Sequence, residues 1–242
     1  MIEKVTGIVL TSIRHSDRYD ITSVYTRERG RVPVATPASR GRKSGCRRGT
    51  MLPLGIVGLE LASARSSEIR RLRQAASLRV WRSIYFDPHK MAIAMFLTEF
   101  LDRLSRESGS DARVWDYIEE SISLLDALPR GLALANFPLT LLASLTPLLG
   151  IAPDVSGYVA GSIFDMRAGG FTVFEPGHSD VLRGERARGA WLLRRINFAN
   201  SGRYRFHIAD RRTALELLLR YYSIHLPGLG SLKSPEVLSQ LL

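Results

Sequence analysis

The residues that could do chemistry in this 242-residue chain are mostly arginines, and they gather near its start. Between positions 27 and 48, eight basic side chains are opposed by Glu28 alone, and glycines punctuate the stretch. Guanidinium and ammonium groups bind phosphate oxygens without regard to base sequence, so this cluster is typical of a surface for a nucleic-acid backbone. The predicted contacts are Arg27, Arg29, Arg31, Arg40, Arg42, Lys43, Arg47 and Arg48.

The position of the charge supports this interpretation more than its amount does. The first 80 residues hold 16 Lys and Arg against six Asp and Glu, whereas the remainder holds 18 against 17. A GC-rich genome that favours arginine, or affinity for an acidic membrane surface, would also raise the net charge to +11. Genomic bias does not explain why the excess lies in one third of the chain, so nucleic acid is the favoured partner.

Catalytic patterns are weak, and we predict that the chain is not an enzyme. Glu99 and Asp102 are three residues apart and are most simply the solvated edge of a helix, while Asp17 and Asp20 complete no nuclease-like acidic cluster. The segment 40–44 (RGRKS) lacks the spacing of a nucleotide-binding loop.

Cysteine and histidine usage predicts no cofactor. Cys46 is the only cysteine and is interpreted as an incidental loop residue, because no histidine stands near it to activate the thiol. The histidines offer no close pair at metal-ligand spacing. The start of the chain lacks a leader pattern and no apolar run is long enough to span a bilayer, so we expect a cytoplasmic protein.

Residues 1-80 show the period of strands. Alternating Val, Ile and Thr occur in 3–13 and 19–26, a turn at 27–30 leads into 31–35, and two further strands are expected within 51–61 and 68–75. Five short strands in this length predict an OB-fold barrel. The fold class is therefore α+β: a five-stranded OB-fold barrel in 1-80, followed by a helical C-terminal domain in 81-242.

The period then changes to that of helices. Asp87 and Pro88 begin a helix that runs to Arg106, and others are expected over 111–128, over 132–149 with kinks or breaks at Pro138 and Pro147, and over 179–195. Asp210 is expected to cap a helix that reaches Tyr222, and a last short helix is expected from Ser234. Glycines in 150-181 predict an inserted β-hairpin, with strands at 162–166 and 171–174.

Two tyrosines accompany the basic strands. Tyr19 and Tyr25 are six residues apart, so in a regular strand both point into the barrel or both point out of it. If they point out, they could stack on unpaired bases; if they point in, they fill the core. Both alternatives remain open from the sequence.

The order of elements and several short sequence segments resemble the RecO family of bacterial recombination mediators. The opening strand 7–10 (GIVL), the hairpin around Gly30 and the basic segment 40–44 match its start. The segments 221–228 (YYSIHLPG) and 232–238 (LKSPEVL) are similar to the C-terminal end of its Bacteroidetes-type members. Together they cover nearly the whole chain.

The resemblance implies binding to single- and double-stranded DNA, strand annealing, and partnership with RecR, single-stranded DNA-binding protein (SSB) and, indirectly, RecA. Many members carry four zinc-binding cysteines where this chain has none, so the hairpin is expected to fill that place by packing. Docking of the acidic SSB tail is implied for the helical domain, with Arg194, Arg195, Arg211, Arg212 and Trp191 as candidate contacts. A non-catalytic RNA-binding OB-fold protein and a metal-dependent nuclease remain as alternatives.

Overall fold

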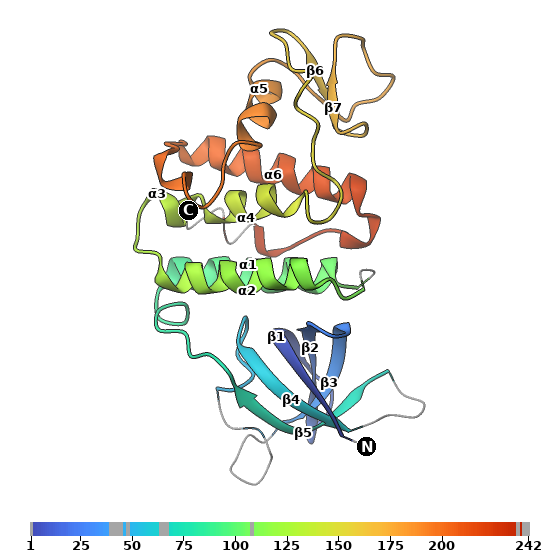
Figure 1. Ribbon diagram of the computed structural model, residues 1–242, viewed down its shortest axis with the longest axis vertical. Coiled ribbons are helices and arrows are strands. Elements are labelled where there is room, and N and C mark those ends of the chain that lie inside the picture. The colour runs from blue at the N-terminus through green and yellow to red at the C-terminus, as the bar shows by residue number, and fades with distance from the viewer. Residues whose placement is uncertain are drawn as a thin grey trace. The chain divides into compact units, whose positions relative to one another are not determined.

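The computed structural model describes residues 2–38, 46, 49–62, 68–106, 109–235 and 238. Its first elements form a closed barrel with the strand order β1-β2-β3-β5-β4, in which β3 and β5 are parallel and the other pairs antiparallel (Figure 1). This five-stranded closed barrel is OB-like, as predicted. The strands are β1 (Ile2–Arg14), β2 (Tyr19–Thr26), β3 (Gly30–Pro37), β4 (Ile56–Ala62) and β5 (Arg70–Ser77).

Alternation along the strands builds the barrel core. On β3 every second residue is buried, because Val32 and Val34 point inward while their neighbours face outward. Cys46 lies in a bend outside the strands, as expected of a loop residue, but it is only 2% exposed and belongs to this core, so its role is not incidental. A register shift between Val9 and Ser12 on β1 lets the strand change its facing residues before the first turn.

Two helices pack with the barrel in the first of two compact units. They are α1 (Pro88–Leu104) and α2 (Ala112–Ala127), and Figure 1 shows both lying across one end of the barrel. As predicted, Asp87 caps α1: its carboxylate accepts from the backbone N–H of His89 at 2.9 Å, and Pro88 occupies the first turn. Contacts within the chain group α1 and α2 with the barrel, so the first compact unit extends to Ala127. The predicted helical domain over residues 81-242 remains a proposal.

The end of the chain returns to this first unit from Gly228 onward. The Glu99 carboxylate accepts hydrogen bonds from the backbone N–H of Lys233 at 3.0 Å and of Ser234 at 2.7 Å. Glu99 thus anchors the C-terminal segment, and the buried Asp102 is only 5% exposed, so the expected solvated helix edge is wrong for both residues. Most of the helix expected from Ser234 lies outside the described residues.

The second unit, Leu128–Pro227, combines helices with a small sheet. The expected helix over 132–149 is two helices, which meet just before Pro138 and end ahead of Pro147. The inserted hairpin is confirmed as β6 and β7, but β8 joins it as a third strand. The elements are α3 (Leu132–Ala135), α4 (Phe137–Leu145), β6 (Ile163–Asp165), β7 (Gly170–Thr172), β8 (Val181–Leu182), α5 (Gly184–Leu193) and α6 (Ile208–His225), with 3₁₀ turns at Ser201–Arg203 and Pro227–Leu229.

Two helix starts differ from the sequence prediction. The segment from Ser179 first pairs as β8, because Val181 and Leu182 complete the sheet, and α5 begins only at Gly184. Helix α6 begins before Asp210, which lies in its first turn, where its negative charge suits the helix dipole, and is not the cap. The small sheet packs on α6 through Phe164, Met166 and Tyr221.

Candidate nucleic-acid interface

The turn between β1 and β2 forms one exposed tip of the barrel. Its backbone is closed by the Ser16 N–H, which donates to the Tyr19 carbonyl at 3.0 Å, and the Ser16 hydroxyl accepts from the backbone of Arg18 and Tyr19 at 3.3 Å. Arg14 pairs with Asp17 at 2.7 Å. These local hydrogen bonds hold the backbone of the turn in one conformation, which fixes the positions from which its side chains project.

A row of outward side chains continues from this tip across four strands. Ile13 pairs with Ile21, Ile21 with Ala35, and Ala35 with Arg71, so these residues share one face of the sheet. The adjacent positions Thr22 and Thr36 are fully buried, which confirms that the row points away from the barrel interior. We call this surface the hairpin face; it comprises Ile13, His15, Arg18, Tyr19, Ile21, Ala35, Arg71 and Arg73.

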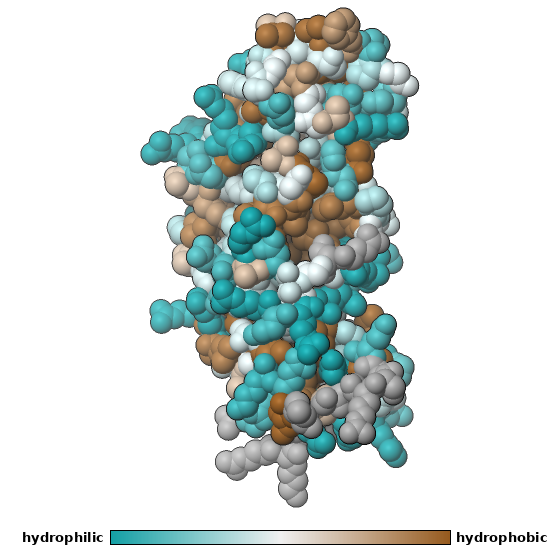
Figure 2. All heavy atoms as spheres, turned by 45° about the vertical axis from the view of Figure 1, so that its right-hand side comes forward, coloured by the Kyte–Doolittle hydropathy of each residue, from teal (hydrophilic) through white to brown (hydrophobic). Residues whose placement is uncertain are grey.

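Three arginines of the hairpin face are exposed: Arg18, Arg71 and Arg73. Within the described residues, none of the three guanidinium groups has an ion-pair partner. Arg73 is the extra residue where the register of β4 and β5 shifts, and such a bulge turns a side chain toward solvent. On the face drawn in Figure 2 the barrel surface is mainly hydrophilic, interrupted by small hydrophobic patches. The hairpin face can therefore accept phosphate groups.

Aromatic rings accompany these cations. The rings of His15 and Tyr19 are stacked with centroids 5.2 Å apart at 28°. Tyr25 shares the outward face of β2 but is only 4% exposed, and burial raises the pKa of its hydroxyl. Both tyrosines thus point out of the barrel, and the rest of the first unit covers Tyr25 while Tyr19 stays accessible.

The predicted arginines of the β2–β3 turn have acidic partners within the protein. Arg27 lies 3.0 Å from Asp116 of α2 and over the Trp115 ring, at 5.6 Å. Arg29 pairs with Glu3. This turn packs against the helices of its unit, since a Cβ on Gly30 would lie 3.1 Å from the backbone of Gly109. Its arginines would have to exchange partners before binding a phosphate.

Arg31 is tied more firmly than the other two. Its Nε donates to Asp102 at 3.0 Å, and Arg106 donates to the same carboxylate at 2.9 Å. Burial of Asp102 opposes ionisation, but hydrogen bonds from Ser23, Arg106 and Arg31 and the charge of Arg31 outweigh it, so the pKa of Asp102 is lowered. Arg31 therefore joins β3 to α1, which is an internal role that the sequence did not predict.

The other five predicted contacts lie outside the described residues: Arg40, Arg42, Lys43, Arg47 and Arg48. Their described neighbours are placed. The Ala38 N–H donates to the Arg18 carbonyl at 3.0 Å, beside the hairpin face, and Cys46 is buried in the barrel core.

One of the candidate partner-binding residues of the second unit, Arg211, is buried. Arg211 is only 7% exposed; its Nε donates to the Asn136 side chain at 3.1 Å, and burial lowers its pKa. Arg195 lies over the Trp191 ring at 4.8 Å, whereas Arg212 is exposed on α6. Arg211 therefore has an internal role and leaves the proposed partner surface.

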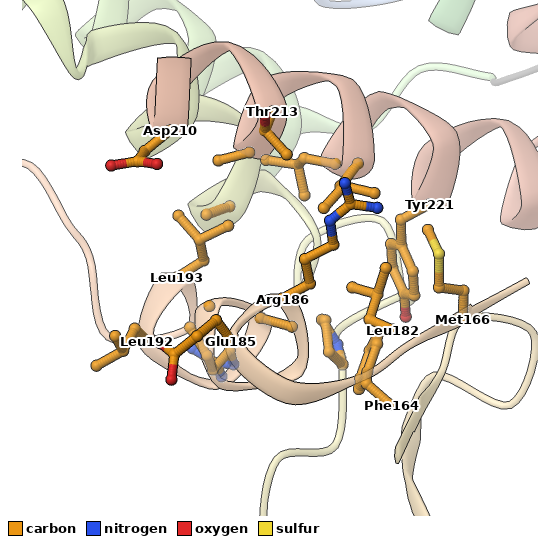
Figure 3. Close-up of a pocket in the computed structure, with 18 of the residues that line it drawn as sticks. Phe164, Met166, Leu182, Glu185, Arg186, Leu192, Leu193, Asp210, Thr213 and Tyr221 are labelled. Carbon is orange, nitrogen blue, oxygen red and sulfur yellow. The ribbon is translucent and has the colours of Figure 1, made fainter. Parts of the chain in front are cut away.

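Arg194 lines a pocket of about 630 Å³ between the small sheet, α5 and α6. Its wall is mostly apolar. Figure 3 shows Arg186 extending from α5 toward α6, with Asp210 at the end of the lining away from Tyr221. The charged groups in the lining are Glu185, Arg186, Arg194 and Asp210. A pocket of this size accepts a small ligand or the anchoring side chains of a peptide.

Metal and membrane sites do not emerge from the described part of the chain. No group of three or more His, Cys, Asp or Glu in these ranges could hold a metal ion. Nor does any described helix have the length and apolar character to cross a bilayer. In the region of the inserted hairpin, Phe164, Met166 and Leu182 belong to one hydrophobic cluster.

Sequence reasoning missed Arg18, Arg71 and Arg73 as candidate contacts. The signal was present in the segment 70–73 (RRLR), because alternation around the buried Leu72 places Arg71 and Arg73 outward. Arg18 could have been found as a cation in a two-strand turn of an OB-like barrel, where nucleic acids commonly bind.

Comparison with known proteins extends over the whole chain. Residues 1–81 match the family "Recombination protein O N terminal", and residues 85–236 match "Recombination protein O C terminal". Curated relatives carry the name DNA repair protein RecO. The protein from Phocaeicola vulgatus is 34% identical over 241 residues, covering 100% of this chain and 99% of the relative.

Other relatives agree in extent. The protein from Bacteroides fragilis (strain YCH46) is 32% identical over 242 residues, with 100% and 99% coverage, and that from Porphyromonas gingivalis (strain W83) is 32% identical, with 97% coverage of each chain. The OB-like barrel, the helices that follow it and the two matched regions appear in the same order along the chain. The chain therefore belongs to the RecO family of DNA repair proteins.

Proposed function

We propose that this chain is a DNA-binding recombination mediator of the RecF pathway, acting in the cytoplasm at the nucleoid. It binds single- and double-stranded DNA without sequence preference, anneals complementary strands, and with RecR helps RecA load onto SSB-coated DNA. The single observation that carries the proposal is the hairpin face, an OB-like barrel surface with arginines whose charge is not neutralised by described residues. Family membership supports the same direction.

The mechanism needs no catalytic residue. Two complementary strands repel each other through their phosphates, and a surface that binds both strands reduces that repulsion. Contacts to phosphates position the strands, while the bases find their partners by pairing. The Ala38 N–H donates to the Arg18 carbonyl at the hairpin face, and Arg40, Arg42 and Lys43 follow Ala38 in the sequence. In this proposal their side chains add further phosphate contacts.

The test is annealing of two complementary oligonucleotides, each coated with the cognate SSB. We expect wild type to accelerate annealing, and the variant Arg40→Ala/Arg42→Ala/Lys43→Ala to lose the acceleration, because it lacks three phosphate contacts. The control is Arg188→Ala/Arg203→Ala/Arg205→Ala, which removes equal charge from exposed positions of the second unit. If neither wild type nor the control variant accelerates annealing, the mediator proposal is overturned.

Salt dependence checks the contact type. With roughly six phosphate contacts on a single strand, the logarithm of the affinity should fall with the logarithm of salt concentration at a slope of about −4. An affinity that does not change with salt concentration would contradict binding to the phosphate backbone of DNA. Tighter binding to structured RNA would favour the RNA-binding alternative, and magnesium- or manganese-dependent loss of labelled DNA would reveal a nuclease.

For the second unit we propose that the pocket beside Arg194 receives the acidic C-terminal tail of SSB. Apolar tail side chains would enter the pocket, and Arg186 and Arg194 would pair with its carboxylates. We expect Arg186→Glu/Arg194→Glu to abolish binding of a fluorescent tail peptide, measured by anisotropy, while Arg212→Glu on α6 retains it. The reverse pattern would exclude the pocket and return the site to the surface of α6.

A further inference from the structure

The stacked pair of His15 and Tyr19 stands at the tip of the hairpin face and has no role in the barrel core. Tyr19 is 38% exposed, whereas Tyr25 on the same face of the same strand is 4% exposed. Core packing therefore explains Tyr25 and leaves Tyr19 without a structural reason. An exposed aromatic pair beside unneutralised arginines is the arrangement used to bind unpaired bases.

The pair is preorganised. The ring centroids of His15 and Tyr19 lie 5.2 Å apart at 28°, and the Ser16 side chain and backbone hold the intervening turn by hydrogen bonds of 3.0 to 3.3 Å. Little rotamer freedom remains to be lost when a base stacks on an already stacked ring. More of the stacking energy then contributes to the affinity for DNA.

The surroundings suit a nucleotide. Ile13 is 70% exposed and pairs with Ile21 in the same outward row, which provides apolar contact for a base or sugar. Arg18 adjoins Tyr19 in sequence, and Arg71 ends the same outward row, so cations that can bind phosphates share the face that carries the rings. Apolar surface, rings and cations thus lie together on one face.

We propose that the His15–Tyr19 pair is a stacking platform that makes the barrel prefer unpaired over paired DNA; this rests on the proposed DNA-binding function. Bases in a duplex are stacked on one another and present no free face, so the platform contributes nothing to duplex binding. Annealing removes the stacking contact. The finished duplex is therefore held by phosphates alone and leaves more readily than the single strands that formed it.

The experiment compares three labelled probes of equal length: a single strand, its duplex, and a strand of abasic sites with the same phosphate charge. We expect Tyr19→Ala to weaken single-strand binding by roughly 5- to 100-fold, and to change duplex and abasic binding by less than about twofold. Tyr19→Phe should retain wild-type preference, because it keeps the ring. Phe86→Ala removes an aromatic residue that is 81% exposed outside the hairpin face and should have no effect.

A second readout reports stacking directly. Fluorescence of 2-aminopurine in the single strand should be quenched by wild type and by Tyr19→Phe but not by Tyr19→Ala. If Tyr19→Ala binds and quenches like wild type while Arg18→Glu/Arg71→Glu/Arg73→Glu loses DNA, the platform is wrong and the DNA-binding proposal stands. If wild type binds none of the probes, both proposals fall.

Discussion

Arg18→Glu/Arg71→Glu/Arg73→Glu is expected to lower affinity for single-stranded DNA by on the order of 100-fold at low salt. Each reversal removes a favourable phosphate contact and adds a repulsive charge on the hairpin face. Loss of three contacts should also make the salt slope shallower by about 2. Fluorescence anisotropy of a labelled oligonucleotide, titrated at several salt concentrations, measures both quantities.

The matched control for this variant is Arg188→Glu/Arg203→Glu/Arg205→Glu, which changes the net charge equally but in the second unit. It should lower affinity by only a few-fold, through the overall field of the protein. An equal loss in both variants would mean that DNA binds the general positive charge and not the hairpin face. Unfolding curves for each variant establish that the loss is not caused by misfolding.

Asp126→Ala is expected to destabilise the first unit by about 3–5 kcal/mol. The Asp126 carboxylate accepts from the backbone N–H of Arg82 at 2.9 Å, of Ser83 at 2.8 Å and of Ile84 at 3.0 Å. Removal of the carboxylate leaves these donors without their partner where the chain passes from the barrel to α1. Asp126→Asn keeps one oxygen acceptor and should lose roughly half as much.

Urea denaturation can follow this unit by tryptophan fluorescence. Trp81 and Trp115 lie in the first unit, and a Trp191→Phe background removes the tryptophan of the second unit. Glu120→Ala, at an exposed position of the same helix, is the control and should change stability by less than about 0.5 kcal/mol. An Asp126→Ala unfolding curve that matches this control would disprove the role of the carboxylate.

The Asp126 contribution should also depend on pH. Partial burial raises the pKa of Asp126, but the three backbone hydrogen bonds outweigh it, so the folded-state pKa lies below its usual value. A lowered carboxyl pKa stabilises the fold above the unfolded-state value of about 3.9, and this stability is lost as the pH falls through the folded-state pKa. The stability difference between wild type and Asp126→Asn should therefore shrink between pH 7 and pH 3.

Lys90 shows why this junction could not be derived from the sequence. It lies on the first turns of α1 and is only 4% exposed; its Nζ donates to the Ser83 hydroxyl at 2.7 Å and to the Asp126 carbonyl at 2.8 Å. A lysine in a helix is ordinarily predicted to face solvent. Its partners come from two other segments, and only the folded chain brings them within reach.

The sequence by itself determined the local elements and the family. Alternation predicted the barrel strands, with 19–26 matching β2, and Asp87 with Pro88 predicted the start of α1, because caps and periodicity depend on neighbouring residues. The resemblance to the RecO family followed from short sequence segments and their order along the chain. The comparisons with known proteins confirm the family.

The tertiary structure decided which charged and aromatic groups are available to DNA. Arg31 meets Asp102 from 71 positions away, and Arg211 meets Asn136 from 75 positions away, so neither partner can be read from local spacing. The two tyrosines of β2 share a face, yet only Tyr19 stays exposed. Density of charge is a property of the sequence, whereas the solvent exposure and pairing of each charge depend on which distant residues the fold places beside it.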